Sequence, residues 1–157
     1  MRLEDLVDPR LVFTDLEGQT LEEVLTEMAE CLEKAQVVRD APDLARRLLE
    51  RERLGCTGLG GGIAIPHCKL KDLQDVLLSV GISERGVDFH APDGERVTLI
   101  FLILSPAQAP AQHLQALARI SRLLRTPGLA ASLRQAGSAE EIVGTLREAE
   151  GRLPIPV

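Results

Sequence analysis

One run of residues limits the possible folds of this chain more than any other. The segment Val97–Leu104 reads VTLIFLIL and is apolar at every position except Thr98. A strand of this composition buries side chains on both of its faces, so it needs a layer of structure on each side. Its length suits a strand and is far below the ~20 residues of a membrane-spanning helix. The run therefore predicts a buried strand inside a layered α/β domain.

Helical patterns lie before and after this run. Two of them open with a capping box, a Ser or Thr followed three residues later by Glu, at Thr20 and at Ser138. A third begins at Asp40 and ends at Gly55, which is expected to take a left-handed conformation. The spacing of apolar residues predicts helices at residues 20–34, 40–55, 113–125, 126–137 and 138–150.

Extended segments are predicted between these helices. Ile63–Ile65 is read as a short extended piece and Asp75–Ser83 as a buried strand, and the chain reverses at Pro92–Gly94. The segment Ser105–Gln112, SPAQAPAQ, is expected to be a loop. Because helices precede, separate and follow the strands, we predict a single-domain α/β sandwich with a small mixed sheet and helices on both faces.

The composition excludes several classes of function. The formal net charge is −6, and phosphate contacts need a basic surface, so a nucleic-acid role is disfavoured. Three Phe without any Trp or Tyr are also too few for base stacking. Three cysteines without CxxC spacing indicate reduced thiols and a cytoplasmic location. No segment suits a signal peptide or a membrane span, so neither export nor membrane insertion is expected.

The three histidines are the first candidates for chemistry. His67 follows Pro66 at the end of an extended segment, and ligands of open α/β sheets bind at the carboxyl ends of strands. His113 follows the strongest predicted strand and stands near the start of a helix, where anions are favoured. His90 lies in a turn context and is read as a solvated loop residue.

Three chemistries could use these histidines. A metal site would need ligands from the set Cys56, His67, Cys68 and His113. No CxxC or HxxxH spacing supports that set, and adjacent residues of an extended chain point to opposite faces. Nucleophilic catalysis by Cys68 lacks any local signature. In the third chemistry, neutral His67 accepts a phosphoryl group, with Arg51 as the cation and glycine amides as donors.

The segment Leu48–Leu70, LLERERLGCTGLGGGIAIPHCKL, resembles the active-site signature of the type-2 enzyme IIA family of the bacterial phosphoenolpyruvate-dependent phosphotransferase system. The family pattern reads R-E, then G-x-T-x-(I/L)-G-x-G-x-A-I-P-H. This chain matches it at Arg51, Glu52, Gly55, Thr57, Gly58, Leu59, Gly60, Gly62, Ala64, Ile65, Pro66 and His67. The resemblance continues through residues 89–124 and 138–151.

The resemblance implies a mixed five-stranded sheet flanked by helices, and a reaction that requires no metal or cofactor. It implies that His67 accepts a phosphoryl group from phospho-HPr, or from its nitrogen-branch counterpart, as a tele-phosphohistidine. A hydrogen bond at the other ring nitrogen, for instance to a backbone carbonyl, would orient this ring. His113 would be the supporting second histidine, and Arg51 would stabilise the phosphoryl group. The phosphate loop would consist of Gly58, Gly60 and Gly62.

Within the family the chain most resembles the nitrogen-regulatory branch, with residues 1–151 as the IIA domain and 152–157 as a C-terminal tail. We expect a phosphotransferase component whose phosphorylation state regulates a downstream protein. One alternative is the IIA component of a fructose- or mannitol-type sugar uptake system, which would pass phosphate to a IIB component. Another is a IIA-like binding module that accepts no phosphate. Gly61 departs from the family, which often has Asn there, and its effect on activity is left open.

Overall fold

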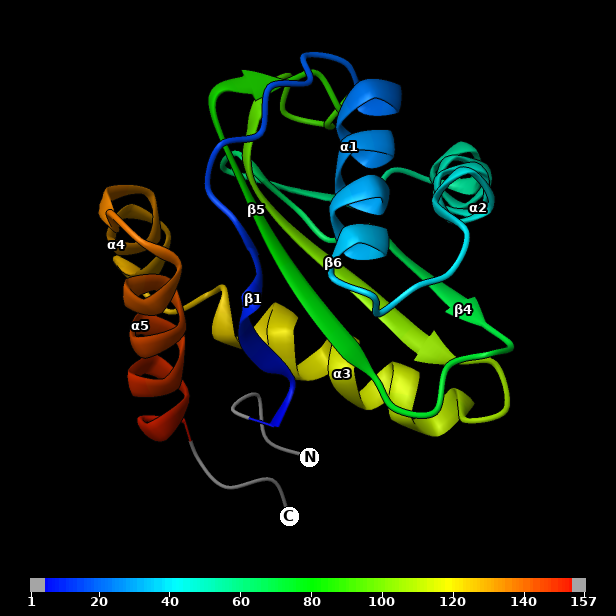
Figure 1. Ribbon diagram of the computed structural model, residues 1–157. Helices are drawn as coiled ribbons and strands as arrows, with labels where there is room; N and C mark the ends of the chain where they lie inside the picture. Colours follow the sequence, from blue (N-terminus) through cyan, green and yellow to red (C-terminus); the bar gives the residue numbers. More distant parts are fainter. Residues whose placement is uncertain (1–4, 154–157) are drawn as a thin grey trace.

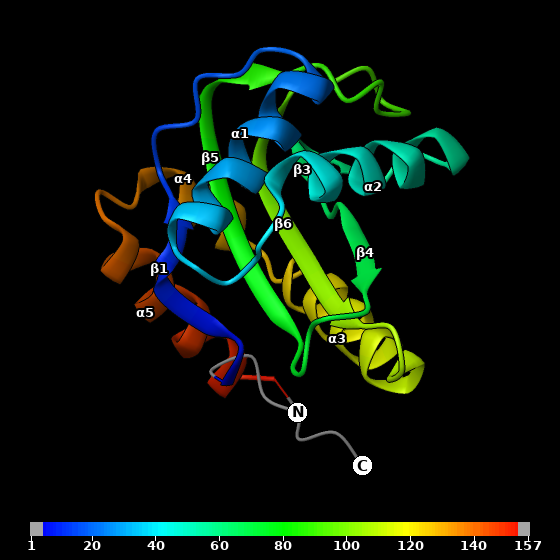
Figure 2. The same cartoon turned by 45° about the vertical axis from the view of Figure 1, so that its right-hand side comes forward.

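Two layers of helices enclose a mixed β-sheet in the computed structural model, which describes residues 5–153 (Figure 1). Its elements along the chain are β1 (Val7–Phe13), α1 (Leu21–Lys34), α2 (Ala41–Leu54), β2 (Gly58–Gly60), β3 (Ile63–Ala64), β4 (His67–Leu70), β5 (Leu77–Val87), β6 (Val97–Pro106), α3 (Pro110–Leu123), α4 (Leu129–Gln135) and α5 (Ala139–Gly151). Helices α1 and α2 cover one face of the sheet, and α3, α4 and α5 cover the other (Figure 2). The predicted α/β sandwich is confirmed.

The sheet has six strands that occupy five positions. Its order is β1-β5-β6-β3-β2, and β4 pairs with β6 as well. Ile63 lies opposite Leu99 and His67 lies opposite Ile103, so β3 and β4 follow each other along one edge of β6. Both run parallel to β6, whereas β5 pairs with it in the antiparallel sense. The sheet is therefore mixed, as expected, and the carboxyl end of β6 lies beside β4.

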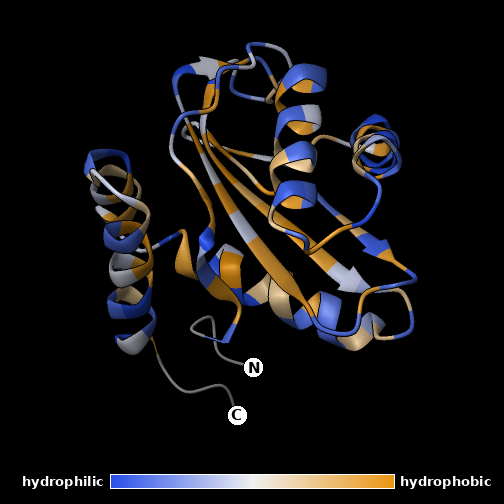
Figure 3. Ribbon diagram, in the orientation of Figure 1, coloured by the Kyte–Doolittle hydropathy of each residue, from blue (hydrophilic) through white to orange (hydrophobic). Residues whose placement is uncertain are grey.

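Alternate side chains of β6 enter two separate cores. One set packs with α3, α4 and α5 and consists of Leu99, Phe101 and Ile103. The other set packs with α1 and α2 and consists of Ile100, Leu102 and Leu104. All of these side chains are at most 1% exposed, which confirms the prediction of a strand buried on both faces. Figure 3 shows apolar residues concentrated along β5 and β6, between helices that combine polar and apolar faces.

At both predicted capping boxes the N-cap hydrogen bond is present, while the Glu23 carboxylate accepts from the Thr20 hydroxyl and the Glu141 carboxylate from the N–H of Gly137. The Thr20 hydroxyl accepts a hydrogen bond from the backbone N–H of Glu23 at the start of α1. The Ser138 hydroxyl accepts one from the N–H of Glu141 at the start of α5. Each cap satisfies a backbone donor that the first turn of a helix leaves without an intrahelical partner.

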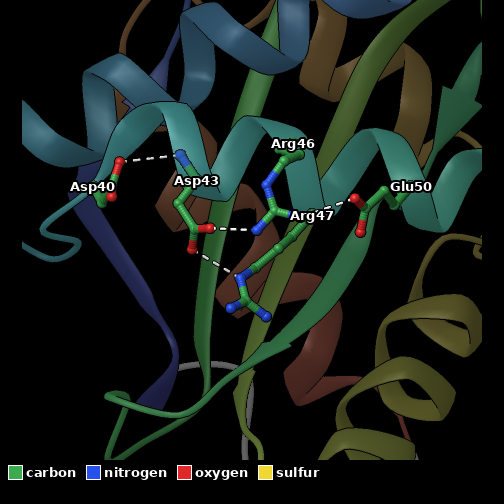
Figure 4. Close-up of polar contacts among 5 residues, drawn as sticks. All are labelled: Asp40, Asp43, Arg46, Arg47 and Glu50. Atoms are coloured by element: carbon green, nitrogen blue, oxygen red, sulfur yellow. Dashed lines mark hydrogen bonds and ion pairs between the residues drawn. The ribbon is translucent and has the colours of Figure 1, made fainter.

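Polar contacts along the outer side of α2 hold the helix that carries Arg51 (Figure 4). Asp40 caps the first turn by accepting from the N–H of Asp43 at 3.0 Å. The Asp43 carboxylate pairs with Arg46 at 2.6 Å and with Arg47 at 2.8 Å. Solvent screens such exposed pairs, so they add little to the stability of the fold and mainly favour the helical conformation of this segment.

The end of α2 differs from the prediction. Gly55 follows the helix with φ 167°, which is extended backbone and not the expected left-handed conformation. Its N–H donates to the Glu52 carbonyl at 3.1 Å, and its own carbonyl accepts from Arg51 Nη1 at 3.1 Å. The arginine thus supplies a partner for a terminal carbonyl, and the chain leaves the helix without a left-handed turn.

Three further elements were not predicted as such. Strand β1 contains Asp8, Pro9 and Arg10, and its pairing with β5 is irregular between Val7 and Val12. It lies at the edge of the sheet, where a proline is tolerated. The glycine-containing segment Gly58–Gly60 forms the short strand β2, and residues 67–70 continue as strand β4.

The loop prediction for SPAQAPAQ was wrong at both ends. Its first two residues, Ser105 and Pro106, belong to β6. Its last three form the first turn of α3, which begins at Pro110. Proline suits this position because its missing N–H would have no helical partner there. The helix thus begins three residues before His113, whereas the prediction began it at His113.

The predicted boundary between domain and tail falls close to the end of α5 at Gly151. Most of the expected tail, residues 154–157, lies outside the described residues, so the boundary stays a prediction. Within residues 5–153, no helix combines the length and the apolar character that crossing a bilayer demands.

Candidate functional site

His67 is the first residue of β4, and hydrogen bonds to two neighbouring segments fix the backbone just before it. The N–H of Ile65 donates to the Thr57 carbonyl, and the Pro66 carbonyl accepts from the N–H of Ile103, each at 3.0 Å. The ring nitrogen Nδ1 lies 2.7 Å from the Ile65 carbonyl oxygen. Because a carbonyl only accepts, Nδ1 carries the ring hydrogen and Nε2 of the neutral ring has a free lone pair. The expected carbonyl contact is confirmed.

The structure brings His113 of α3 next to His67 of β4. The two ring centroids are 5.3 Å apart, with the ring planes inclined at 53°. The His113 side chain is buried, and its Nδ1 lies 2.7 Å from the hydroxyl of Ser105 at the end of β6. His67 is only partly buried, so the pair joins a buried ring to one that solvent or a partner can reach.

Both imidazoles are kept neutral at neutral pH. Burial lowers the pKa of His67; the hydrogen bond to the Ile65 carbonyl opposes this effect, and the charge of Arg51 adds to it. Burial also lowers the pKa of His113, and His67, Lys69 and Arg51 lower it further. At both rings the charge of Arg51 disfavours protonation, although Glu52 opposes it at His67, so the arginine gives the pair a positive local field within an acidic chain. Such a field suits an anionic group near the pair.

Arg51 lies in the last turn of α2. The neighbouring Glu52 connects that turn, through hydrogen bonds, to the segment before β2. Glu52 is buried and accepts hydrogen bonds from both the N–H and the hydroxyl of Thr57. Thr57 in turn accepts from Ile65 through its carbonyl. The two motif residues Glu52 and Thr57 thus link the arginine-bearing helix to the backbone that holds His67.

The glycine turn lies away from the imidazoles. Gly60, Gly61 and Gly62 all have positive φ, and the turn precedes β3. Since His67 is four residues beyond Ile63 in register along β6, the turn is separated from His67 by about 13 Å or more. Among residues 5–153, no hydrogen bond joins Gly58, Gly60 or Gly62 to either ring of the pair, and neither ring is among the nearest neighbours of a Cβ built at these glycines. Their assignment as a phosphate loop stays a prediction.

Contacts with two other elements explain the shape of this turn. The N–H of Gly61 donates to Asp93 Oδ2 at 2.9 Å, and the Gly61 carbonyl accepts from Arg134 Nη2 at 2.6 Å. A Cβ at Gly62 would lie 2.7 Å from Arg134 Nη2. The flexible Arg134 side chain could move, but the left-handed φ of +80° and the Arg96 carbonyl oxygen at 3.2 Å favour glycine at position 62, whereas nothing lies within 4 Å of a Cβ built at Gly61.

The structure does not assemble the alternative metal or cysteine sites. Cys68 packs with the apolar cluster on the α1 and α2 side, the face opposite to His113. Burial raises the pKa of the Cys68 thiol to about 12, so it is not a thiolate at neutral pH. Cys56 Sγ accepts from the N–H of Gly58 and contacts the Phe89 carbonyl. In the described part of the chain, no group of three or more His, Cys, Asp or Glu side chains is placed to hold a metal ion.

His90 lies apart from the pair. Its side chain is 81% exposed and its φ is +54°, which agrees with the prediction of a solvated loop residue. Ser105 and Lys69 are the residues beside the pair that sequence reasoning missed. The signal for Ser105 was a polar residue at the end of a long apolar run, and for Lys69 it was the two-residue spacing from His67 along a strand.

Three large apolar side chains are exposed among the described residues: Leu54, Leu59 and Leu114. Leu54 follows Arg51 by one helical turn, and Leu114 follows His113 directly. Ile63, by contrast, is buried in the core. Chemically, the arrangement offers a partly exposed neutral nucleophile, a second neutral imidazole and a guanidinium, with exposed leucines near Arg51 and His113 in the sequence.

Comparison with known proteins gives the chain a family. A sequence model described as "Phosphoenolpyruvate-dependent sugar phosphotransferase system, EIIA 2" matches residues 5–149. The "Nitrogen regulatory protein" of Bradyrhizobium diazoefficiens is 39% identical over 148 residues, which cover 93% of this chain and 95% of that protein. The "PTS system fructose-specific EIIABC component" of Bacillus subtilis is 32% identical and covers 94% of this chain, which spans 23% of that protein.

A solved structure agrees with this result. The crystal structure of the nitrogen regulatory protein IIA-Ntr from Neisseria meningitidis superposes with a TM-score of 0.84 at 30% sequence identity. The superposition covers 92% of this chain and 98% of that one. The likeness therefore extends over the whole sandwich, including the strands and helices that carry the histidine pair.

Proposed function

Because the chain belongs to the EIIA type-2 family of the phosphoenolpyruvate-dependent sugar phosphotransferase system, we propose that His67 accepts a phosphoryl group from a phosphohistidine carrier protein. The observation that carries this proposal is the Nδ1 contact to the Ile65 carbonyl, which leaves Nε2 as the free nucleophilic nitrogen of a partly exposed ring. The product would be a phosphohistidine substituted at Nε2, the tele form.

The proposed step exchanges one nitrogen–phosphorus bond for another. The lone pair of His67 Nε2 forms a bond to phosphorus while the bond from phosphorus to the carrier's histidine breaks. The carrier's ring keeps that electron pair and departs as neutral imidazole, because its second nitrogen holds a proton. His67 becomes a phosphoimidazolium whose Nδ1 proton stays bonded to the Ile65 carbonyl. Position and electrostatics supply the catalysis in such a transfer.

The charges around the pair support this assignment. Arg51 disfavours protonation of both rings, and Lys69 disfavours protonation of His113. The same positive charges favour the negative charge of a phosphoryl group. Arg51 brings a planar, permanently charged donor suited to phosphoryl oxygens. His113, 5.3 Å from His67, is the second group facing the reacting atoms.

The carrier would dock over His67 and would contact exposed leucines. Leu54 and Leu114 flank the positions of Arg51 and His113 in the sequence and offer apolar area to a partner. We propose an HPr-like carrier as this partner. The reaction would take place in the cytoplasm, and the three free cysteines of the described chain support that location.

Two downstream roles are consistent with a phosphorylated His67. The likeness to proteins named nitrogen regulatory protein, at nearly full coverage of both chains, favours a regulator whose phosphorylation state changes its binding to a target protein. The likeness to a fructose-specific EIIABC component supports the second role, transfer onward to a IIB component. Adding a purified IIB component to the phosphorylated protein separates the two roles, since only the second predicts rapid loss of the label.

The direct test is incubation with phosphoenolpyruvate, enzyme I and an HPr-like carrier, followed by mapping of the labelled residue. We expect one acid-labile phosphoryl group on His67 and no labelling of His67→Ala. His90→Ala is the matched control, because His90 is exposed and apart from the pair, and it should be labelled at the wild-type rate. Undiminished labelling of His67→Ala would contradict the assignment.

His113→Ala should still be labelled on His67, but more slowly by a factor of ~10² to 10³, the usual cost of removing one donor to a developing anion. Rapid-quench measurement of the first turnover checks this expectation. An unchanged rate would deny His113 a role in the transfer.

A further inference from the structure

Ser105 contacts the His113 ring and is completely buried near the carboxyl end of β6. Its Oγ lies 2.7 Å from Nδ1 of His113. This hydrogen bond could run in either direction, since a hydroxyl and a neutral imidazole can each donate or accept. The direction decides which nitrogen of the His113 ring carries the hydrogen.

Burial selects one of the two directions. Among residues 5–153, the Ser105 hydroxyl makes no hydrogen bond other than the one with His113. If Nδ1 donated to Oγ, the hydroxyl hydrogen would be buried without a partner, which is costly. Donation from the hydroxyl to Nδ1 satisfies both groups. The ring hydrogen of His113 is then on Nε2.

His67 has the opposite arrangement for an equally simple reason. The Ile65 oxygen that faces its Nδ1 can only accept, so the ring hydrogen is on Nδ1. The two neighbouring rings therefore occupy opposite tautomers. In His67 the nitrogen Nε2 is a lone-pair nucleophile, and in His113 the same nitrogen is an N–H donor.

We propose that Ser105 is a positioning residue that fixes His113 in the Nε2–H tautomer, so that of the two adjacent histidines only His67 presents a nucleophilic Nε2. The inference rests on the proposed function, because it assigns roles within the same transfer. It explains how two similar rings 5.3 Å apart perform different tasks. His113 donates to a phosphoryl oxygen through Nε2–H, and it cannot compete for phosphorus through that nitrogen.

The neutral state that tautomers require is supported by the surroundings. Burial lowers the pKa of His113, and the nearby charges of Lys69 and Arg51 lower it further. The serine hydroxyl acts in the same sense, because a doubly protonated ring would leave it without an acceptor for its hydrogen.

The first measurement is nitrogen NMR of the histidine rings in the full wild-type chain at about pH 8, where an ordinary histidine is neutral. Long-range couplings between ring protons and ring nitrogens distinguish the two tautomers. We expect the Nδ1–H form for His67 and the Nε2–H form for His113. The Nδ1–H form for His113 would overturn the proposal, whatever the transfer assay shows.

The second measurement compares variants by NMR and by transfer rate. In Ser105→Ala, His113 should lose its single tautomer and transfer to His67 should slow roughly tenfold, less than removal of a donor outright. Ser105→Thr keeps the hydroxyl and should retain the tautomer. Ser79→Ala is the matched control: Ser79 is also a buried strand serine, and its hydroxyl donates to the Leu11 carbonyl at 2.8 Å, away from the pair.

Urea unfolding of the alanine variants separates a structural role from a positioning role. If Ser105→Ala and Ser79→Ala lose similar stability but only Ser105→Ala changes the His113 tautomer and the rate, the proposal is supported. An unchanged tautomer in Ser105→Ala would overturn it. Opposite tautomers in a wild-type chain that is never labelled would leave this inference standing and refute the proposed function instead.

Discussion

At the scale of single residues, the surroundings of His67 disfavour its protonated form, which suits its proposed role as a nucleophile. Burial lowers its pKa below the ordinary histidine value of 6.5, and Arg51 contributes in the same direction. A lowered pKa means that the lone pair on Nε2 stays free at neutral pH. It is lost only as the pH falls through a value below the ordinary one.

This gives a prediction for Arg51→Ala. The transfer rate should fall by ~10² or more, because a charged donor to the phosphoryl oxygens is lost. The acid limb of the pH–rate profile should also move to higher pH, because removal of the cation raises the pKa of His67. Single-turnover rates measured across the acid range, with the carrier in excess, give both quantities.

Arg51→Lys is the matched control for charge. It keeps the positive charge but loses the planar fork, so the acid limb should stay close to its wild-type position while the rate still falls. If the acid limb of Arg51→Ala stayed in place or moved to lower pH, Arg51 would not act electrostatically on His67.

Sequence reasoning could identify the site residues that chemistry requires but not those that position them. His67, His113 and Arg51 have chemical types that phosphoryl transfer needs, and the structure brings their charges and rings together. Ser105 has no such signature, because its importance arises from the packing of α3 beneath β6. The contacts of Gly61 with Asp93 and Arg134 likewise arise from tertiary packing and have no local sequence signal, while the phosphate-loop role of Gly58, Gly60 and Gly62 stays a prediction.

At the scale of elements, the buried link between Glu52 and Thr57 joins the end of α2 to the strands β2 and β3. Both side chains are less than 10% exposed. Thr57→Val should remove the hydroxyl donor from a buried carboxylate and lower the free energy of unfolding by about 1–3 kcal/mol. Urea unfolding followed by far-UV circular dichroism measures the change.

Thr145→Val is a fair comparison for that variant. The Thr145 hydroxyl donates to the Glu141 carbonyl at 2.7 Å within α5 and is only half-buried. Its loss should cost less than that of Thr57. An equal or larger loss of stability at Thr145 would show that the Glu52–Thr57 link has no special importance.

The elements divide into those set by local signals and those set by tertiary packing. Helices α1 and α5 begin where capping boxes predict, because a cap is complete within four residues. Strand β1 has no comparable local signal, since its pairing with β5 and its contact with α5 stabilise a sequence containing Asp8, Pro9 and Arg10. The end of α2 was mispredicted for a different reason, because a local contact, from the Arg51 side chain to the Gly55 carbonyl, replaces the expected left-handed turn.

At the scale of the whole molecule, side chains from α1 and from the segment before it fill the space over Gly81 of β5. A Cβ at Gly81 of β5 would lie 2.5 Å from Leu16 Cδ1 and 3.0 Å from Met28 Cε. Gly81→Ala should therefore displace the buried Leu16 and Met28 side chains and destabilise the protein by about 1–3 kcal/mol. Thermal unfolding should show a clear fall in Tm.

Gly144→Ala should have the opposite effect on stability. Gly144 lies inside α5, where a Cβ would meet nothing within 4 Å, so alanine should stabilise the helix by about 0.5–1 kcal/mol. A gain of stability in Gly81→Ala would contradict the close packing of α1 on β5.

The contact between the Ile65 carbonyl and the His67 ring also bears on what happens after phosphorylation. A phosphoryl group on Nε2 is released most easily when the leaving imidazole is neutral and not an anion. Because the carbonyl holds a proton on Nδ1, the ring is ready to do so. Under the proposed function, the phosphorylated protein is thus a reversible store of transfer potential. The same hydrogen bond favours both the transfer of the phosphoryl group to His67 and its transfer from His67 to the next acceptor.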